Sequence, residues 1–439
     1  MDRRPRFELR ALDNPAFRRV LLALVGIPIG LFYLWRVVLE PLVFGTYLGD
    51  FQESYMRAAG RIAGGFDPYD LCATLGCQEP TGPQYVTPPL LAWLLQPLVG
   101  IDSHVVAAAV VVVLNVSLAL FLACMVRALH VRDWQLAALL VITALSFGPV
   151  IGNIDEGQVN LVLLALSGLW LWSWVEGGWW GGVPLAAAVA LKVIQAPVGV
   201  LVLWGRRWAM LTAAIITGTG LCLLAAPQYL FEYLVKVLPV VSAGTGLYEN
   251  HSPGGTIARL IDPATFLGAE RGSPPLARTI TILIAVIALV ITLAVLRNPA
   301  RDRTGRSLEA AAIVAVAPLV ASYSWGTHLV LLLLPMLVLV AWGVRNRDWT
   351  VLAMVGGSSL LIGPGSQRLQ TLLVSGYSNL LVLRVMAELG VVAVMAIWLA
   401  SLLAVTRQRA RAAGQTGLAE GLGQAENQPV ASRLRGGNR

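Results

Sequence analysis

Three ionisable side chains stand where the surrounding sequence is strongly apolar. Asp50 directly follows the first long apolar segment, Lys192 interrupts the apolar run 183–204, and His328 opens another apolar run. An ionisable group at the depth or the surface of a membrane is costly, so it is a candidate functional group. A carboxylate can take a proton from a hydroxyl, an imidazole can donate to an anion or a sugar, and a lysine can face an anion. These three residues are therefore the first candidates for chemistry.

Each of the three residues also has a structural interpretation. A carboxylate at the start of a helix, where Asp50 is expected, caps free backbone amides and is stabilised by the helix dipole. His328 could satisfy its ring with a loop carbonyl, and Lys192 could belong to a buried ion pair. The residue types alone leave both interpretations open.

The stretch "DFQESYMRAAGRIAGG" after the first apolar segment predicts a helix that lies in the membrane interface. Its apolar residues recur at helical spacing and its polar residues fall on other faces. Glycines and the turn "GGFDPYD" end this helix. Glu53, one turn after Asp50, either orients a site or faces solvent. The apolar positions are Phe51, Tyr55, Ala58, Ala59 and Ile62.

The composition identifies the chain as a polytopic membrane protein. Of its 439 residues 57% are hydrophobic and only 13% are charged, and the mean hydropathy is +0.71. We predict an all-α bundle of about 10–12 transmembrane segments, because many apolar runs are long enough to cross about 30 Å of hydrocarbon. The runs lie near 20–44, 104–126, 134–151, 158–175, 183–204, 209–230, 276–296, 308–322, 328–344, 349–363 and 379–405.

Arginine clusters predict the orientation of these segments. Lys and Arg remain on the cytoplasmic side of short loops, which assigns a cytoplasmic tail at 1–19, a transmembrane domain at 20–405 and a disordered cytoplasmic tail at 406–439. The net charge of +8 is explained by these clusters, so we expect no nucleic-acid partner. The predicted outer loops are 45–103, 152–157, 231–275, 323–327 and 364–378.

Topology also predicts a break in one apolar run. Between the outer loop at 152–157 and the inner "RRW" at 206–208 the number of crossings must be odd, yet two apolar runs lie there. We therefore expect 183–204 to form a broken hairpin that enters and leaves on the cytoplasmic side, with its bend between Lys192 and Pro197. A misassigned loop is the alternative.

Other polar residues carry weaker signals. Cys72 and Cys77 could close a small disulfide in an oxidising compartment, or they could be unrelated thiols. Asp155 and Glu156 are adjacent carboxylates without a nearby histidine, which is a weak metal signal, so we predict no metal. The chain has no phosphate-binding loop and no nucleophile elbow, which argues against a nucleotide-sugar or ATP site.

Short motifs in a fixed order resemble the membrane glycosyltransferases of the GT-C fold, and within them glycosyltransferase family 87, the polyprenol-phosphate-mannose-dependent alpha-mannosyltransferases. The first outer loop carries the acid Asp50, then "GFDPY", then Tyr85 before two prolines and a short apolar helix within 85–98. The other motifs are "GQVNLVLLAL" (157–166), "LKVIQAPVGVLVLWGRRW" (191–208), "ENHSPGGTIARL" (249–260) and "YSWGTHLVLLLLP" (323–335).

The resemblance implies an inverting transfer of a sugar, mannose by preference, from polyprenyl phosphate to a hydroxyl of a lipid-linked glycan or glycolipid. The enzyme would act at the extracytoplasmic face of the plasma membrane, without a cofactor, among membrane lipids. One carboxylate suffices as base for such a displacement, and Asp50 is expected in that role with His328 as its partner. The resemblance also implies that donor phosphate or sugar is bound by Lys192, Arg259, Tyr85, Gln158, Asn160, Asn250, Trp325 and Tyr55.

These residues also have structural interpretations, and the chain has alternative functions. Trp325 could be an interface aromatic, Arg259 a solvated loop residue, and Gln158 and Asn160 caps of a helix start. A transporter or flippase for a lipid or polar solute is the alternative function, because broken helices with charged residues also mark carrier sites. A membrane acyltransferase is less favoured, because the chain offers no convincing nucleophile.

Overall fold

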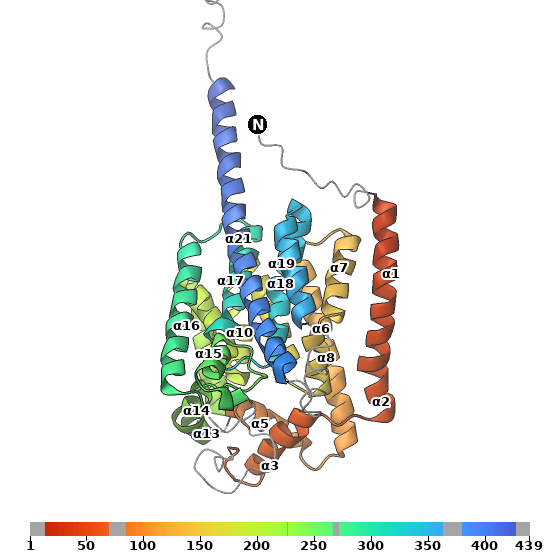
Figure 1. Cartoon of the computed structure of the whole chain (residues 1–439), viewed down its shortest axis with the longest axis vertical. Helices are drawn as coiled ribbons and strands as arrows, with labels where there is room; N and C mark the ends of the chain where they lie inside the picture. Colours follow the sequence, from red (N-terminus) through yellow and green to blue (C-terminus); the bar gives the residue numbers. More distant parts are fainter. Residues whose placement is uncertain (1–13, 70–84, 226, 267–271, 363–379, 427–439) are drawn as a thin grey trace, which may run out of the picture.

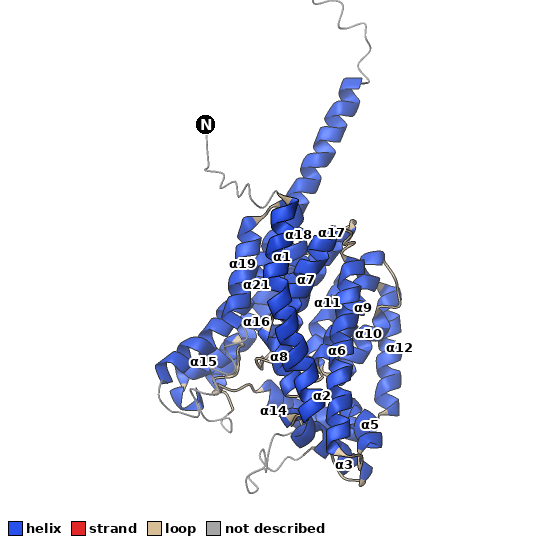
Figure 2. Ribbon diagram, turned by 90° about the vertical axis from the view of Figure 1, so that its right-hand side faces the viewer, coloured by secondary structure: helices blue, strands red, loops and turns tan. Residues whose placement is uncertain are grey.

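The computed structural model describes residues 14–69, 85–225, 227–266, 272–362 and 380–426. Every regular element in these ranges is a helix, which confirms the predicted all-α class (Figure 2). The predicted disulfide between Cys72 and Cys77 lies outside the described residues.

Long helices form an upright bundle in Figure 1, with α1 at one side and α16 at the other. Within the described residues, five helices are long and apolar enough to span a membrane, or up to seven if two bent pairs each count as one span. This number is below the predicted 10–12, because several apolar runs fold into shorter helices or carry charges. The helices of the bundle are α1 (Pro15–Tyr33), η2 (Leu34–Leu39), α2 (Glu40–Phe44), α6 (Ser103–Ala128), α7 (Trp134–Leu145), α8 (Gly148–Asp155), α9 (Asn160–Glu176), α12 (Trp208–Leu224), α16 (Pro275–Val295), α17 (Arg303–Val320), η8 (His328–Leu332), α18 (Leu333–Asn346) and α19 (Trp349–Ile362).

Short helices gather at the lower end of the bundle in Figure 1. They include the helix predicted after Asp50, whose apolar stripe is buried apart from the half-buried Ile62. This stripe holds the helix against the bundle, as its spacing predicts. The short elements are η3 (Phe51–Met56), α3 (Arg57–Ala63), α5 (Pro89–Leu95), η4 (Gln96–Leu98), α13 (Pro227–Glu232), η6 (Tyr233–Val237), α14 (Leu238–Ser242), α15 (Pro253–Ile261) and η7 (Pro263–Phe266).

The centre of the bundle is formed by α17 and α18. Nearly every side chain of α17 from Gly305 to Leu319 is buried, and small residues dominate its "EAAAIVAVAP" segment. Small residues let neighbouring helices approach closely in a membrane, where dispersion contacts replace the hydrophobic driving force. In the first span, Pro15–Phe44, and in α16, by contrast, only 11% of the residues in the most apolar stretch are buried, so apolar side chains point outward, as in lipid-facing helices.

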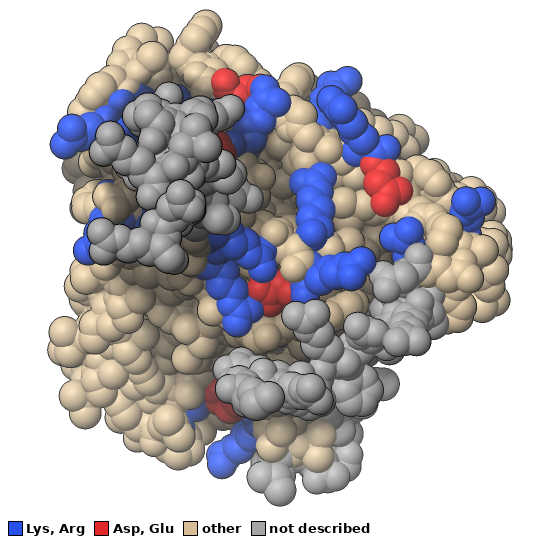
Figure 3. Space-filling view, turned by 90° about the horizontal axis from the view of Figure 1, so that it is seen from above, with Lys and Arg blue, Asp and Glu red and all other residues tan. Residues whose placement is uncertain are grey.

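The upper end of the bundle carries the arginine clusters. Figure 3 views this end and shows more Lys and Arg than Asp and Glu among the described residues. Arg303 pairs with Glu176 at 2.8 Å, and Arg345 donates to the carbonyl of Leu129 at 2.8 Å. The predicted cytoplasmic clusters therefore lie together at one end, opposite the short helices.

The predicted hairpin is present and breaks at Lys192. Its limbs are α10 (Gly182–Leu191) and α11 (Ala196–Trp204), joined through η5 (Val193–Gln195). Lys192 is extended, with φ −159° and ψ 120°, so the helix stops there.

Both ends of the hairpin lie beside the end of α9. The Gly181 N–H donates to Ser173 at 2.8 Å, and Gly205 lies against Trp174. Lys192 instead reaches Asn160 at the start of α9. The chain therefore enters and leaves this segment at the upper end, with the bend at the other end of α9.

The C-terminal segment corrects one prediction. Helix α21 (Leu380–Glu426) continues well beyond the bundle in Figure 1, so the expectation of disorder from residue 406 is wrong as far as Glu426. The segment "RQRARAA" is rich in strong helix formers and continues a helix that already exists, which avoids the cost of nucleation. Residues 427–439 lie outside the described residues.

Candidate active site

Asp50 does not cap a helix. Its backbone is already helical, with φ −62° and ψ −35°, and its side chain accepts no capping hydrogen bond from the following amides. The carboxylate Oδ2 instead accepts a hydrogen bond from the side-chain Nε2 of Gln158. The capping interpretation of Asp50 is therefore wrong, because a partner 108 residues further along the chain binds the carboxylate.

Gln158 connects Asp50 to two other predicted residues. Its Oε1 accepts from the Tyr55 hydroxyl at 2.6 Å and from Lys192 Nζ at 3.3 Å. Lys192 Nζ also donates to Asn160 Oδ1 at 3.1 Å. One amide thus holds a carboxylate at its nitrogen end and an ammonium at its oxygen end.

Local folding explains why these groups meet. Gly157 has φ +67°, in the region that favours glycine, and a side chain there would collide with Phe51 and Leu48. The chain can therefore turn from α8 into α9 directly against the start of η3. The Phe51 N–H also donates to the Glu156 carbonyl at 3.1 Å, which fixes this contact.

His328 lies on the far side of the Lys192 and Asn160 pair. The carbonyl of Thr327 accepts from Asn160 Nδ2 at 3.3 Å and from Asn153 Nδ2 at 2.7 Å, which fixes the turn that leads into His328. The imidazole is 7% exposed, and the charge of Lys192 acts on it. Its Nδ1 is buried and has no hydrogen-bond partner in the described part of the chain, and the backbone of Tyr323 also acts on the ring.

Two predicted aromatic residues have structural contacts. The Tyr85 hydroxyl donates to the Pro88 carbonyl at 2.5 Å and accepts from the Ala92 N–H at 3.1 Å, which holds the start of α5. Its ring packs edge-on against Tyr55 at 6.2 Å. Trp325 is half-buried and lies 5.4 Å from the ring of Tyr323.

Asn250 and Arg259 belong to a second network. Asn250 is fully buried, and its Nδ2 donates to the carbonyls of Thr245 and Ser322 while its Oδ1 accepts from the Ser324 N–H. Arg259 pairs with Glu388 at 2.8 Å. With its nitrogens so engaged, the guanidinium is not placed as a free phosphate clamp, and both residues hold the loop that contains them.

Two carboxylates near Asp50 were not assigned to the site from sequence. Burial, and then the negative charge of Asp50, raises the pKa of Glu156. Burial, and to a smaller degree the negative charge of Asp50, also raises the pKa of Glu249. The sequence marks Glu156 only as a weak metal ligand, and Glu249 precedes the polar residues of the "ENHS" motif without a signal of its own.

The carboxylates near Asp50 are not arranged as a metal centre. Within the described ranges no three His, Cys, Asp or Glu side chains come together in a way that could hold an ion. Positive charge at the site comes instead from Lys192, which the hydrogen bonds of Gln158 and Asn160 keep in place.

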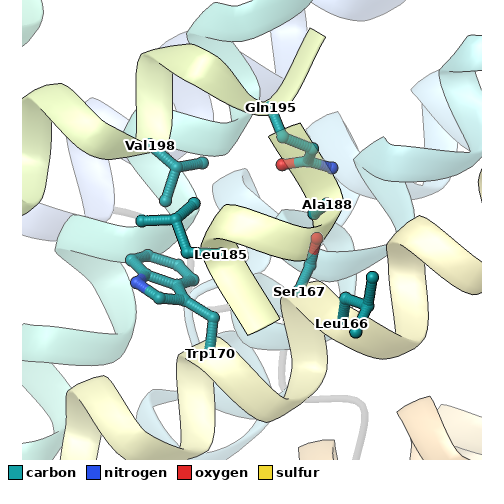
Figure 4. A pocket seen from close by; sticks show the side chains of 7 residues that line it. All are labelled: Leu166, Ser167, Trp170, Leu185, Ala188, Gln195 and Val198. Atoms are coloured by element: carbon teal, nitrogen blue, oxygen red, sulfur yellow. The ribbon is translucent and has the colours of Figure 1, made fainter. Parts of the chain in front are cut away.

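A small gap beside the hairpin is distinct from this site (Figure 4). It is too small to admit a water molecule and lies between α9 and the two limbs of the hairpin. The buried Trp170 Nε1 and Gln195 Nε2 have no partner in the described residues. The gap is lined by Leu166, Ser167, Trp170, Leu185, Ala188, Gln195 and Val198.

The fold and site define a class of protein: a multi-pass helical membrane protein with a carboxylate and basic groups gathered at one end of the bundle. Comparison with known proteins is more specific. The sequence model of glycosyltransferase family 87 matches residues 85–322, which is more than half of the chain. The chain therefore belongs to this family. Asp50 and His328 lie outside the matched range, whereas Gln158, Asn160 and Lys192 lie within it.

A curated relative is similar over part of its length. It is a polyprenol-phosphate-mannose-dependent alpha-(1-2)-phosphatidylinositol pentamannoside mannosyltransferase of Mycobacterium tuberculosis (strain CDC 1551 / Oshkosh). The two are 27% identical over 232 residues, which is 48% of this chain and 49% of the relative. The match thus spans about half the length of each protein.

Proposed function

We propose that this protein is an inverting glycosyltransferase that moves mannose from polyprenyl phosphate to a hydroxyl of a lipid-linked glycan or glycolipid, at the extracytoplasmic face of the plasma membrane. The single observation that carries the proposal is the Gln158 amide, which binds Asp50 at one end and Lys192 at the other. A base and a cationic group are thereby held a short, fixed distance apart, as a single displacement requires.

The proposed reaction is a single displacement at the anomeric carbon of the sugar. Asp50 takes the proton of the acceptor hydroxyl, and the acceptor oxygen forms a bond to the anomeric carbon of the sugar. The bond from that carbon to the phosphate oxygen breaks, and the polyprenyl phosphate leaves with the electron pair. Lys192, with the imidazole of His328 beside it, stabilises the negative charge that develops on the phosphate. The proposal includes no cofactor.

Family membership and the curated relative support the donor. The relative is named as dependent on polyprenol-phosphate-mannose, and the family match covers the Gln158 and Lys192 segments of this chain. The short helices and outer loops at the end that carries Asp50, opposite the arginine clusters, support the extracytoplasmic placement.

A transfer assay tests the proposal. Purified protein in lipid vesicles receives radiolabelled polyprenyl-phosphate-mannose or the nucleotide sugar GDP-mannose, with a glycolipid acceptor. We expect label in the acceptor from the lipid-linked donor only, and an anomeric configuration in the product, measured by NMR, opposite to that of the donor. Retention of configuration would contradict the inverting mechanism.

Transport is the second candidate, because Lys192 lies at a helix break within the bundle. The same vesicles discriminate between the two functions. Label that crosses the bilayer without becoming covalently attached to an acceptor would favour a transporter or flippase over the proposed enzyme.

A further inference from the structure

The end of α9 that is remote from Asp50 brings two arginines together. Arg207 lies in the turn between α11 and α12, and Arg306 lies near the start of α17. A β-carbon on Gly177, the residue that ends α9, would lie 3.5 Å from Arg207 Nη1 and 3.7 Å from Arg306 Nη1. The two guanidiniums therefore meet over Gly177, at the upper end of the bundle that Figure 3 views.

The end of the helix accounts for Arg306 but not for Arg207. Arg306 Nη1 donates to the Val175 carbonyl at 2.8 Å, so it satisfies one of the backbone acceptors that a helix end leaves free. Arg207 instead stacks on Trp174, with 5.3 Å between its Cζ and the centre of the ring. Among the described residues, no hydrogen bond or ion pair engages the Arg207 guanidinium.

The acids close to the two arginines bind other groups. Glu176 pairs with Arg303 at 2.8 Å. Glu309 acts electrostatically on Arg207, but its Oε1 accepts from Arg409 Nη2 at 3.3 Å and from a backbone N–H at 2.7 Å. Two cations that are held together while the neighbouring acids are engaged elsewhere attract an anion.

The chemistry of the two arginines suits a phosphate group. Burial, and then the positive charge of Arg306, lowers the pKa of Arg207, and an anion between the two groups would remove this repulsion. Both side chains are half-buried, so each keeps surface that a ligand can reach. A guanidinium that stacks on an aromatic ring still presents its N–H edge, which matches two phosphate oxygens.

The surroundings of the two arginines are those of a lipid headgroup. Trp204 and Trp208 flank the turn that holds Arg207, and their side chains are 42% and 58% exposed. Tryptophan rings gather at the level of the headgroups in membranes. The helix α12 begins at Trp208, has Met210 as its only buried residue, and forms one edge of the molecule in Figure 2. Acyl chains can therefore follow α12 while the phosphate lies at the arginines.

We infer that Arg207 and Arg306 bind the phosphate of an anionic phospholipid, in the leaflet at the arginine-rich end of the bundle. The site is distinct from the candidate active site, because the 17 residues of α9 separate the two by about 25 Å. The inference does not depend on the proposed transfer reaction. A phosphate held by both arginines would join the hairpin to α9 and α17 and stabilise the bundle.

The test measures binding of phosphatidylglycerol to the purified, delipidated full-length protein by native mass spectrometry. Arg207→Gln removes the cation that lacks a protein partner, so the Kd of the most tightly bound phosphatidylglycerol should rise about tenfold. Arg132→Gln is the matched control, because Arg132 is exposed in the loop between α6 and α7 at the same end and carries the same charge. Its Kd should stay within about twofold of the wild type.

Arg207→Lys separates the geometry of the guanidinium from its charge. The variant keeps the charge and loses the planar fork, so the Kd should rise about threefold. It also decides the matter if Arg207→Gln does not fold. Thermal unfolding gives a second readout: phosphatidylglycerol should raise the Tm of the wild type more than phosphatidylcholine does, and Arg207→Gln should reduce this difference.

Several outcomes would overturn the inference. An unchanged Kd in Arg207→Gln would do so, as would equal losses in both glutamine variants or equal affinities of the wild type for phosphatidylglycerol and phosphatidylcholine. Displacement of the lipid by millimolar glycerol phosphate would assign the site to a soluble phosphate compound instead of a membrane lipid. Because no turnover is involved, failure of the proposed transfer reaction would be recognised separately.

Discussion

Gln158 determines how the two charged groups of the site face each other. A glutamine side chain offers donors at one end and an acceptor at the other, so it can bind Asp50 and Lys192 at the same time. Helix-start rules offer capping as the structural alternative for Asp50 and Gln158, from their neighbours in sequence. The structure differs because both side chains bind side chains from distant segments instead of the local backbone amides.

Lys192→Met should weaken donor binding. The substitution keeps much of the aliphatic volume and removes the cation that faces the proposed phosphate. We expect the KM for polyprenyl-phosphate-mannose to rise about 10- to 100-fold, the effect of losing one charge-assisted contact. Steady-state kinetics in vesicles measures it.

The chain supplies its own control for this variant. Lys236 is the other lysine of the sequence, half exposed and paired with Glu232 at 2.8 Å. Lys236→Met should leave the donor KM unchanged. Equal effects of both substitutions would mean that Lys192 acts through general charge rather than through a phosphate contact.

Among the elements, the segment after α3, which is predicted to belong to an outer loop, is held to η6 and α13. Tyr69 packs against Tyr233 at 6.0 Å, and the Tyr69 N–H donates to Asp67 Oδ1 at 2.8 Å. Burial, and then a hydrogen bond with the Glu232 carboxylate, raises the pKa of Asp67 from 3.8 to about 6. Lys236 acts on Asp67 in the opposite direction.

The pKa of Asp67 gives a pH dependence of stability with a definite sign. A carboxyl that binds its proton more tightly when folded contributes stability below its unfolded pKa, and this contribution is lost as pH rises through about 6. Asp67→Asn keeps a donor for Glu232 at every pH. We therefore expect the Tm of the wild type to fall, relative to that of Asp67→Asn, by about one to a few degrees between pH 5 and 7.5. Parallel pH profiles in differential scanning calorimetry would contradict the shared proton.

The hairpin contains a buried amide donor without a hydrogen-bond partner, and a substitution can remove it. Gln195 is 3% exposed, and its Nε2 has no partner in the described residues, which costs about 1–3 kcal/mol. Gln195→Met has similar volume and no donor, so it should stabilise the protein by about 1 kcal/mol and raise its Tm. A lower Tm would contradict the absence of a partner for this amide in the folded protein.

Sequence patterns predicted the elements better than the contacts between them. The hairpin break at Lys192 followed from counting crossings between arginine clusters, since topology is a property of the whole chain. The role of Arg259 could not be predicted in the same way. Its partner Glu388 lies 129 residues away, and no local rule indicates that this pair anchors the loop before Glu249.

At the scale of the whole molecule, the arginine clusters at one end predict the orientation in the membrane. The described part of α21 ends on that side (Figure 1). A green fluorescent protein fused to the C-terminus should therefore fluoresce in the cytoplasm, and an alkaline phosphatase fusion at the same position should be inactive. An active phosphatase would reverse the orientation and place Asp50 on the cytoplasmic side.

Similarity to the family also has a definite extent in the molecule. Residues 85–322 match, which includes the hairpin and the long loop at 231–275 but neither Asp50 nor His328. The structure brings these two residues to the matched core through Gln158 and Asn160. The central claim, that Asp50 is the base, thus depends on geometry as well as on family membership.

Mannose transfer by Asp50→Asn tests that claim most directly. The substituted side chain keeps its size and can still hydrogen-bond Gln158, but it cannot take a proton. With radiolabelled polyprenyl-phosphate-mannose and a glycolipid acceptor, we expect kcat to fall by about 10²- to 10⁴-fold, the usual contribution of a general base, while the donor KM changes little. A variant that is correctly folded and transfers mannose at the rate of the wild type would contradict the account.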